Sequence, residues 1–287
     1  MRILIFGAEG ALAGQLESVF RSDDVISLRH ADCDITNADD VMRVVRNHRP
    51  THLFNAAAYN DVDTAEADDA TAIAVNATAV AHLASAAAAA GAVMIHYSTD
   101  YVFDGTVHHG YRESDVPHPI NAYGRSKLLG EMAVQSVARE IEGFRWYCIR
   151  TSKLFGPTGS SKGAKKSFVD LMLARADAKA PIEVLDTDMS APTYTVDLAE
   201  ATRRCVDASW FPGIYHLTNS SACTRYGFAQ EIFRQWQTLT GKTPPMLTPV
   251  TSLQRIAARP NFSILLNTKA PPLRSWQEAL RAYLQDL

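Results

Sequence analysis

Short apolar runs alternate along the first half of the chain with longer segments whose apolar positions recur every three or four residues. The runs predict buried strands at residues 2–6, 24–28, 51–55, 93–97 and 146–150. The periodic segments predict helices at residues 10–22, 38–48, 70–90 and 122–140. Strands and helices that alternate at these lengths predict an α/β fold with a doubly wound parallel sheet.

The alternation becomes less regular after residue 150. Residues 156–166 are rich in glycine, serine and lysine, which predicts a loop. Shorter segments then predict helices near 167–178, 196–207, 225–239 and 275–286, and strands near 182–185 and 213–217. We therefore expect a smaller C-terminal α/β portion beside the sheet, without a clear linker.

Composition narrows the class of protein. At 287 residues, 47% hydrophobic and 21% charged, the chain is long enough for a large buried core. A formal net charge of −3 gives no reason to expect nucleic acid or a membrane as partner, and no membrane span or signal peptide is apparent. The four cysteines are far apart and predict reduced thiols in a cytoplasmic protein, and the nine histidines show no metal-binding spacing.

Glycines cluster where the first strand meets the first helix, in the run Gly7-Ala-Glu-Gly10-Ala-Leu-Ala-Gly14. Glycine there allows a tight turn and brings backbone N–H groups close to a pyrophosphate at the helix N-terminus. The run therefore predicts a Rossmann-type dinucleotide site. Arg29 follows the second strand, where such folds often carry an acidic residue on the ribose. An arginine can pair with a 2′-phosphate, so we expect NADPH, with NADH as the alternative cofactor.

Tyr123 and Lys127 are four residues apart in a predicted helix and therefore share one face. A neighbouring ammonium stabilises a phenolate and lowers the pKa of the phenol, which suits proton exchange with a carbonyl or alcohol oxygen. Ser98 and Thr99 follow the fourth strand, at the sheet edge where ligands bind in such folds. Their hydroxyls are candidates for contact with the same oxygen.

Together these motifs resemble those of the dTDP-4-dehydrorhamnose reductase family, within the extended short-chain dehydrogenase/reductase superfamily. The resemblance is carried by Gly7–Gly14, Asn55-Ala-Ala-Ala-Tyr59, Ser98-Thr-Asp-Tyr-Val-Phe-Asp-Gly105, Tyr123-Gly-Arg-Ser-Lys127, Arg150-Thr-Ser152 and Pro192-Thr-Tyr194. It implies reduction of a nucleotide-linked 6-deoxy-4-keto sugar by a reduced nicotinamide. It also implies that Tyr123 protonates the C4 oxygen, that Thr99 polarises the carbonyl, and that Lys127 binds the nicotinamide ribose.

The resemblance also implies the remaining site residues. The expected cofactor-binding residues are Gly7, Glu9, Gly10, Ala11, Leu12, Arg29, Asp34, Ile35, Ala56, Ala57, Ala58, Tyr59, Ser98, Tyr123 and Lys127. The expected substrate-binding residues are Asn60, Val62, Thr99, Asp100, Tyr101, Arg150, Ser152 and Lys153. Lys153 stands where the family commonly has tryptophan, and Asn60 where threonine is common, so these departures bear on the identity of the sugar. A lysine-rich loop with Lys162, Lys165 and Lys166 is a further candidate for contact with the substrate diphosphate.

We expect residues 1–152 to form the NAD(P)-binding domain, residues 153–287 to form mainly the substrate-binding portion, and residues 193–217 to return to the first domain. Two other functions share this fold. The regulatory β subunit of methionine adenosyltransferase resembles the chain in its motifs and acts as a binding partner, and related epimerases retain NAD. The expected assembly is a monomer or a homodimer.

Overall fold

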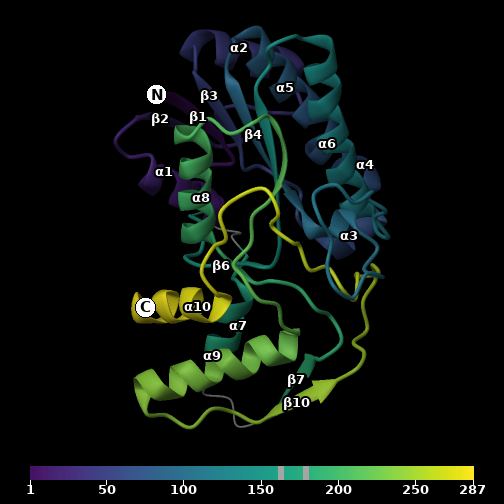
Figure 1. Ribbon diagram of the computed structural model, residues 1–287, viewed down its shortest axis with the longest axis vertical. Helices are drawn as coiled ribbons and strands as arrows, with labels where there is room; N and C mark the ends of the chain where they lie inside the picture. Colours follow the sequence, from purple (N-terminus) through teal and green to yellow (C-terminus); the bar gives the residue numbers. More distant parts are fainter. Residues whose placement is uncertain (161–164, 177–180) are drawn as a thin grey trace.

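A parallel sheet lies at the centre of the protein (Figure 1). The structure is a computed structural model, and it describes residues 1–160, 165–176 and 181–287. Within these residues the sheet has six strands in the order β2-β1-β3-β4-β5-β9. Their bounds are β1 Arg2–Phe6, β2 Asp24–Leu28, β3 His52–Asn55, β4 Val93–Thr99, β5 Trp146–Thr151 and β9 Gly213–His216. Because β2 and β3 flank β1 on opposite sides, a crevice opens beyond the carboxyl ends of β1 and β3. The predicted α/β fold with a doubly wound sheet is confirmed.

Helices cover both faces of this sheet, which explains the uninterrupted apolar runs of its strands. Ile3 and Ile5 of β1 point into one core, packed against α1 (Ala11–Val19) and α8 (Thr195–Asp207). Leu4 and Phe6 point into the other core. That core is covered by α2 (Ala38–His48), α5 (Ala79–Ala89) and α6 (Ala122–Glu140).

The alanine-rich segment before β4 is less regular than the sequence predicts. It follows a short helix that the sequence did not predict, α3 (Val62–Ala67), and consists of α4 (Asp69–Ile73), a π-helical turn at Ala74–Thr78 and α5. By length and composition the run Asp69–Ala89 is apolar enough to cross a membrane, contrary to the expectation from sequence. Half of its apolar window is buried inside the protein, as in a core helix, and α5 packs against α2 and α6.

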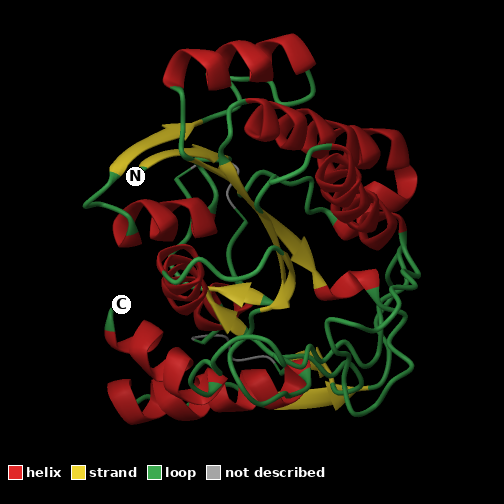
Figure 2. Ribbon diagram, turned by 45° about the horizontal axis from the view of Figure 1, so that its top comes forward, coloured by secondary structure: helices red, strands yellow, loops and turns green. Residues whose placement is uncertain are grey.

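The smaller portion is built from short elements around a separate core (Figure 2). Parallel pairs are formed by β7 (Ile182–Leu185) with β10 (Leu247–Val250), and by β6 (Leu154–Phe155) with β8 (Thr193–Tyr194). The helices are α7 (Phe168–Ala174), α9 (Arg225–Thr240) and α10 (Trp276–Gln285). Aromatic side chains fill this core, with Phe228 against both Phe155 and Trp276. The sequence did not predict β6, β8 or β10.

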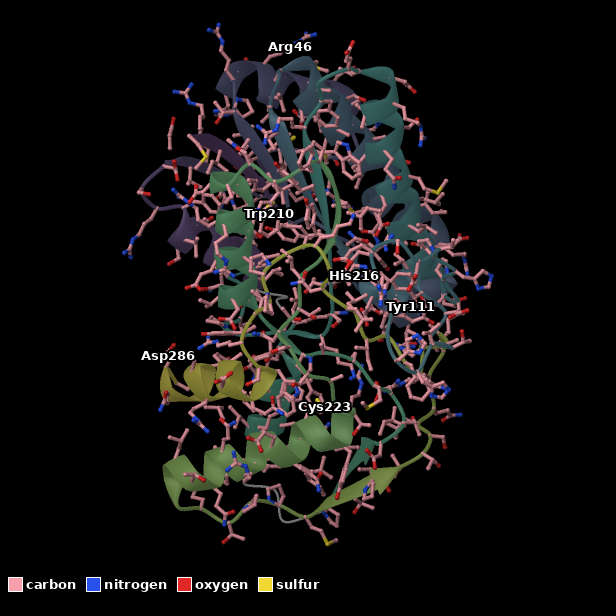
Figure 3. All side chains as sticks on the ribbon, in the orientation of Figure 1. Arg46, Tyr111, Trp210, His216, Cys223 and Asp286 are labelled. Atoms are coloured by element: carbon pink, nitrogen blue, oxygen red, sulfur yellow. The ribbon has the colours of Figure 1, made fainter. Side chains whose placement is uncertain are left out.

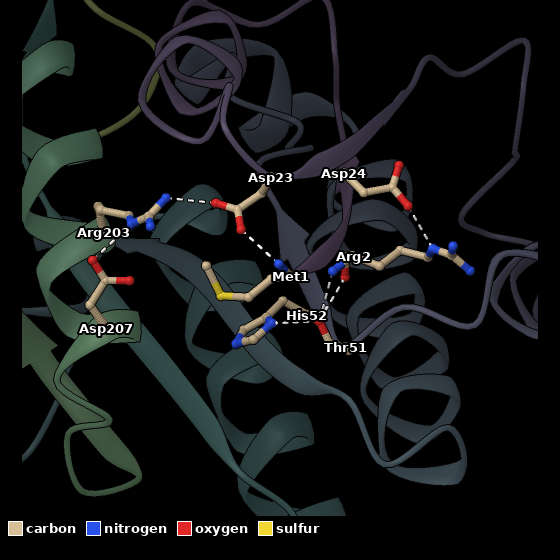
Figure 4. A network of polar contacts seen from close by, with 8 residues as sticks. All are labelled: Met1, Arg2, Asp23, Asp24, Thr51, His52, Arg203 and Asp207. Atoms are coloured by element: carbon tan, nitrogen blue, oxygen red, sulfur yellow. Dashed lines mark hydrogen bonds and ion pairs between the residues drawn. The ribbon is translucent and has the colours of Figure 1, made fainter.

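A polar network closes the opposite end of the sheet, at the amino ends of the strands (Figure 4). The Met1 ammonium donates to Asp23 Oδ1 at 2.7 Å, and Arg203 Nη1 of α8 donates to Asp23 Oδ2 at 2.6 Å. Arg2 pairs with Asp24 at 2.7 Å. These contacts fix the start of the chain to β2 and α8, and they leave the carboxyl ends of the strands as the open edge.

Candidate active site

The turn between β1 and α1 requires glycine. Gly7 has φ +88°, and a Cβ on it would lie 2.6 Å from the backbone nitrogen of Ala57 and 2.8 Å from the carbonyl carbon of Ala56. The loop after β3 therefore passes directly against Gly7, and Gly10 caps the N-terminus of α1. This arrangement leaves room for a pyrophosphate at the helix N-terminus, as the dinucleotide motif predicts.

A cavity of about 490 Å³ lies beside this turn. Among the predicted cofactor residues it is lined by Gly7, Glu9, Gly10, Ala11, Arg29, Asp34, Ile35, Ala56, Ala57 and Ala58. Other lining residues were not predicted to bind the cofactor: Phe6, Ala8, Leu28, His30, Cys33, Thr36, Asn60, Val75, Gly159 and Lys165. Its walls come from β1, β2, β3 and their loops, so its position fits the adenosine half of a dinucleotide.

Arg29 lies in the wall of this cavity with its guanidinium paired to Asp32. Arg29 Nε donates to Asp32 Oδ2 at 3.0 Å, and Nη2 donates to Oδ1 at 3.3 Å. The two side chains are 58% and 35% exposed, and ion pairs this exposed are weak in water. A 2′-phosphate can therefore replace Asp32 as the partner of Arg29 at little cost.

Arg29→Ala should raise the KM for NADPH by roughly 10-fold to 100-fold, because it removes a charge-assisted contact to the 2′-phosphate. The KM for NADH, which has no such phosphate, should change by less than about twofold. Steady-state kinetics with the two cofactors measure both values. An equal rise for NADPH and NADH would show that Arg29 does not recognise the phosphate.

A second cavity of about 360 Å³ adjoins the first and contains the predicted reaction centre. Thr99, Tyr123 and Lys127 line it together with Leu12 and Ser98. The two cavities share wall residues along the glycine turn and the loop after β3, namely Gly10, Ala11, Ala56, Ala57, Ala58 and Asn60, and they also share Lys165. The two cavities are therefore continuous, and their lining suits the adenosine end of a dinucleotide in the first and the nicotinamide end in the second.

Lys127 is held deep in the second cavity, one helical turn after Tyr123 on α6. Its Nζ donates to the Tyr97 carbonyl oxygen of β4 at 2.6 Å, and the residue is 2% exposed. Burial lowers the pKa of Lys127 to about 8, opposed by Cys148 and Glu131. An ammonium fixed in this way presents its remaining hydrogens to the cavity, where they can bind ribose hydroxyls.

Burial also decides the ionisation of Tyr123. It raises the pKa of Tyr123 above its ordinary value, while a hydrogen bond with the Thr99 hydroxyl acts in the opposite direction. The sequence predicts that Lys127 lowers the pKa of Tyr123. In the structure the pKa is raised instead, because desolvation of the phenolate outweighs the hydrogen bond with Thr99. A phenol that keeps its proton is suited to act as the acid in a reduction.

Thr99 is oriented by its neighbours at the end of β4. Its Oγ1 donates to Asp100 Oδ1 at 3.1 Å and accepts from the Tyr101 backbone N–H at 3.2 Å. Asp100 also accepts a 2.5 Å hydrogen bond from Ser263, and burial raises the pKa of Asp100 to about 6. Asp100 lines the cavity, but its carboxylate oxygens are used to hold Thr99 and Ser263.

Lys153 lies in the wall of the second cavity, where its ammonium pairs with Asp188. Its backbone has φ +41°, a region that residues with a side chain rarely adopt and that is common at functional sites. Lys153 Nζ lies 3.3 Å from Asp188 Oδ2, and Arg225 Nε donates to the same oxygen at 2.7 Å. The Lys153 side chain is 16% exposed, and burial lowers its pKa.

The other predicted substrate residues divide into two groups. Asn60 and Ser152 line the second cavity, and Ser152 Oγ donates to the Ala191 carbonyl oxygen at 2.6 Å. Val62, Tyr101 and Arg150 do not appear in the wall of either cavity. Val62 begins α3, and the ring of Tyr101 packs edge-on against Tyr123 at 5.9 Å. Arg150 is buried and forms an ion pair with the buried Glu131.

Tyr59 and the lysine-rich loop also differ from expectation. Tyr59, predicted to bind the cofactor, lines neither cavity, and its backbone N–H and carbonyl are held by Asn76 at 2.9 Å. Lys165 and Lys166 line the second cavity, and Lys165 pairs with Asp61 at 2.8 Å. Lys162 lies outside the described residues. Contact of this loop with a substrate diphosphate stays a prediction.

Thr151 lines the second cavity, as its place between Arg150 and Ser152 in the family's sugar-pocket run implies. Other lining residues were not predicted as binding residues: Asn55, Tyr97, Leu154, Phe155, Gly156, Thr158, Ser167 and Thr195. Gly156 carried a signal in the sequence, because a glycine directly follows a short apolar pair. In the structure its φ is +139°, a value that favours glycine. The segment looked like a plain loop because β6 has two residues, too few for a recognisable strand pattern.

The comparisons with known proteins agree with this geometry. The chain matches the RmlD substrate binding domain family over residues 1–287. It is 33% identical to a dTDP-4-dehydrorhamnose reductase of Burkholderia thailandensis, over 100% of this chain and 99% of the relative. It is 36% identical to the enzyme of that name from Mycobacterium tuberculosis, over 99% and 92% of the two chains.

Solved structures give the same result. A dTDP-4-dehydrorhamnose reductase from Bacillus anthracis in complex with NADP has a TM-score of 0.90 and 31% identity, covering 100% of this chain and 99% of the other. A UDP-glucose 4-epimerase from Thermus thermophilus, at 20% identity and a TM-score of 0.79, shares the fold. The chain therefore belongs to the RmlD substrate binding domain family.

Proposed function

We propose that this protein is an NADPH-dependent reductase of the C4 keto group of a nucleotide-linked 6-deoxy-4-keto sugar. The reaction we propose is dTDP-4-dehydro-L-rhamnose to dTDP-L-rhamnose, in the cytoplasm. The observation that carries the proposal is that Thr99, Tyr123 and Lys127 meet in a cavity that continues into the nucleotide crevice. Relatives named for this reaction, which align along nearly their whole length, support it.

The side chains divide the chemistry of the reduction between them. Bound NADPH supplies the hydride. The Tyr123 phenol donates to the C4 oxygen, and the Thr99 hydroxyl, which donates to Asp100 Oδ1 before the sugar binds, turns to donate to the same oxygen. The growing negative charge then lies between two hydrogen-bond donors. Tyr123 then gives its proton to that oxygen. Because its pKa is raised, the phenol keeps this proton until strong negative charge develops on the C4 oxygen.

Lys127 and the loops hold the reactants in place. The Lys127 ammonium, anchored on the Tyr97 carbonyl, binds the ribose and stabilises the phenolate that remains after proton transfer. The cavity walls from residues 151–156 and Asn60 enclose the sugar and exclude water from the reaction centre. A dry site strengthens each of these electrostatic contacts.

Lys153→Met should raise the KM for the nucleotide sugar by roughly tenfold, since it removes a charged donor from the cavity wall. The KM for NADPH should stay within about twofold of the wild-type value. The Arg225–Asp188 pair at 2.7 Å remains in this variant and keeps the wall in place. Lys269→Met, which removes a lysine bonded to the Ile214 carbonyl outside both cavities, is the matched control. An unchanged KM for the sugar would remove Lys153 from the substrate site.

The proposed function is tested by incubating the protein with NADPH and dTDP-4-dehydrorhamnose while following the absorbance of the reduced nicotinamide. We expect one NADPH to be consumed for each keto group reduced. Tight binding of NADPH without consumption, with this sugar and with other nucleotide-linked 4-keto sugars, would instead identify a cofactor-binding protein without reductase activity.

A further inference from the structure

A buried ion pair lies directly beneath the reaction centre. Arg150 is 1% exposed and Glu131 is fully buried. Arg150 Nε donates to Glu131 Oε1 at 2.9 Å, and Nη2 donates to Oε2 at 2.7 Å. Ser98 Oγ donates to the same Oε1 at 2.5 Å, so the carboxylate accepts three hydrogen bonds from two strands.

The three partners belong to three elements that line the second cavity. Glu131 lies one turn beyond Lys127 on α6, on the same helix face. Ser98 precedes Thr99 on β4, and Arg150 precedes the cavity residue Thr151 on β5. The ion pair therefore joins α6 to the ends of β4 and β5, where a small shift would change the distances between Thr99, Tyr123 and Lys127.

Stability alone is a poor reason for such a pair. The desolvation of two buried charges is large, and well-packed apolar side chains of similar volume are often as stabilising or more so. On its far side the Arg150 guanidinium lies 5.0 Å from the Phe103 ring centroid and 3.4 Å from Nε2 of His216. Figure 3 labels His216 among the side chains. Glu113 accepts from the His216 backbone N–H at 3.3 Å. Arg150 lines neither the first nor the second cavity, so its charge acts on the protein itself.

We propose that Glu131 and Arg150 are positioning residues for the reduction: they fix α6 against β4 and β5 and balance the charge beside Lys127. This inference rests on the proposed function for its kinetic consequences. Other groups that face Lys127 are Tyr123 on α6, His96 and the Tyr97 carbonyl on β4, and Cys148 on β5. Of these, burial keeps the His96 imidazole and the Cys148 thiol neutral at neutral pH. Glu131 is therefore the carboxylate on α6 that acts on the Lys127 ammonium, and Arg150 compensates the charge of this carboxylate.

Removing the two charges singly should move the ionisation of Lys127 in opposite directions. Glu131→Gln leaves the Arg150 cation uncompensated, which disfavours the Lys127 ammonium and lowers its pKa. Arg150→Met leaves the Glu131 carboxylate uncompensated, which favours the ammonium and raises its pKa. If the two substitutions only disturbed the structure, the pKa of Lys127 would move in the same direction in both variants or would not change.

The experiment measures NADPH affinity by nicotinamide fluorescence, and kcat/KM, from pH 6 to pH 10. In the wild type, affinity and kcat/KM should fall as Lys127 loses its proton, with a midpoint near pH 8. The midpoint should move down by roughly one unit in Glu131→Gln and up by roughly one unit in Arg150→Met. Glu113→Gln, which removes a buried carboxylate beyond Arg150, is the matched control and should leave the midpoint in place.

The double variant Glu131→Gln/Arg150→Met keeps the test decisive if either single variant fails to fold. Its midpoint should return to the wild-type value while kcat falls by roughly tenfold, because charge balance is restored and the link between the elements is lost. Shifts of the same sign in both single variants, or a double variant with wild-type kcat, would overturn the proposal. Since NADPH affinity is measured without turnover, a wild-type protein that reduces no keto sugar would contradict the proposed function and leave the charge-balance test intact.

Discussion

Tyr123→Phe is expected to lower kcat for reduction by roughly a thousandfold, because it removes the proton donor to the C4 oxygen. General acid catalysis typically contributes about 10² to 10⁴ in rate. The change deletes one oxygen from a ring that packs edge-on against Tyr101 at a centroid distance of 5.9 Å. The ring contact remains, so the Kd for NADPH should stay within about twofold.

Tyr101→Phe provides the matched control for this variant. Tyr101 is half-buried, as Tyr123 is, and its hydroxyl lies near Arg225 and Arg259, outside the walls of both cavities. The control should retain kcat within about tenfold. Rapid-mixing measurements of NADPH oxidation separate the chemical step from product release. A Tyr123→Phe protein with kcat near that of the wild type would exclude Tyr123 as the acid.

Gly7→Ala is expected to abolish measurable NADPH binding at concentrations that saturate the wild type. The new Cβ would lie 2.6 Å from the Ala57 nitrogen, closer than real Cβ contacts allow, and φ +88° is strained for alanine. The three atoms nearest to this Cβ, in Ala56 and Ala57, all belong to the backbone, so the turn or the loop after β3 must move. That movement displaces the N–H groups that face the pyrophosphate.

Gly14→Ala is the control within the same motif. Gly14 lies inside α1, and a Cβ there would meet nothing within 4 Å. Alanine is favoured over glycine in a helix interior by roughly 0.5–1 kcal/mol, so this variant should bind NADPH normally and melt at the same or a slightly higher temperature. Fluorescence titration and thermal melting compare the two. Equal NADPH affinity in Gly7→Ala and the wild type would refute the assignment of this turn.

The features that could be predicted from sequence are local ones. Tyr123 and Lys127 share one helix face through spacing alone, and Gly7 and Gly10 stand at a strand-to-helix turn. The central strands are recognisable because both faces are buried, which produces continuous apolar runs. The parallel sheet then brings the carboxyl ends of its strands to one edge, so Thr99 and the glycine turn lie in adjoining cavities.

The features that escaped prediction depend on partners far away in the chain. Arg150 was expected at the sugar, but a bidentate contact with Glu131 holds it inside the protein. Lys153 finds its partner 35 residues away in Asp188, and Asp100 finds Ser263 across 163 residues. The raised pKa of Tyr123 follows from its burial, which cannot be predicted from the spacing of residues in the sequence. Strands of two residues, such as β6, have no periodicity to read.

Isotopic labelling tests directly whether hydride is transferred to C4 of the sugar. The protein is incubated with dTDP-4-dehydrorhamnose and NADPH deuterated at C4 of the nicotinamide, each diastereomer in turn, and the product is examined by NMR. We predict that one diastereomer places deuterium on C4 of dTDP-rhamnose, with NADP⁺ formed in equal amount. A product without deuterium from either diastereomer, or a keto sugar recovered unchanged beside bound NADPH, would contradict the account.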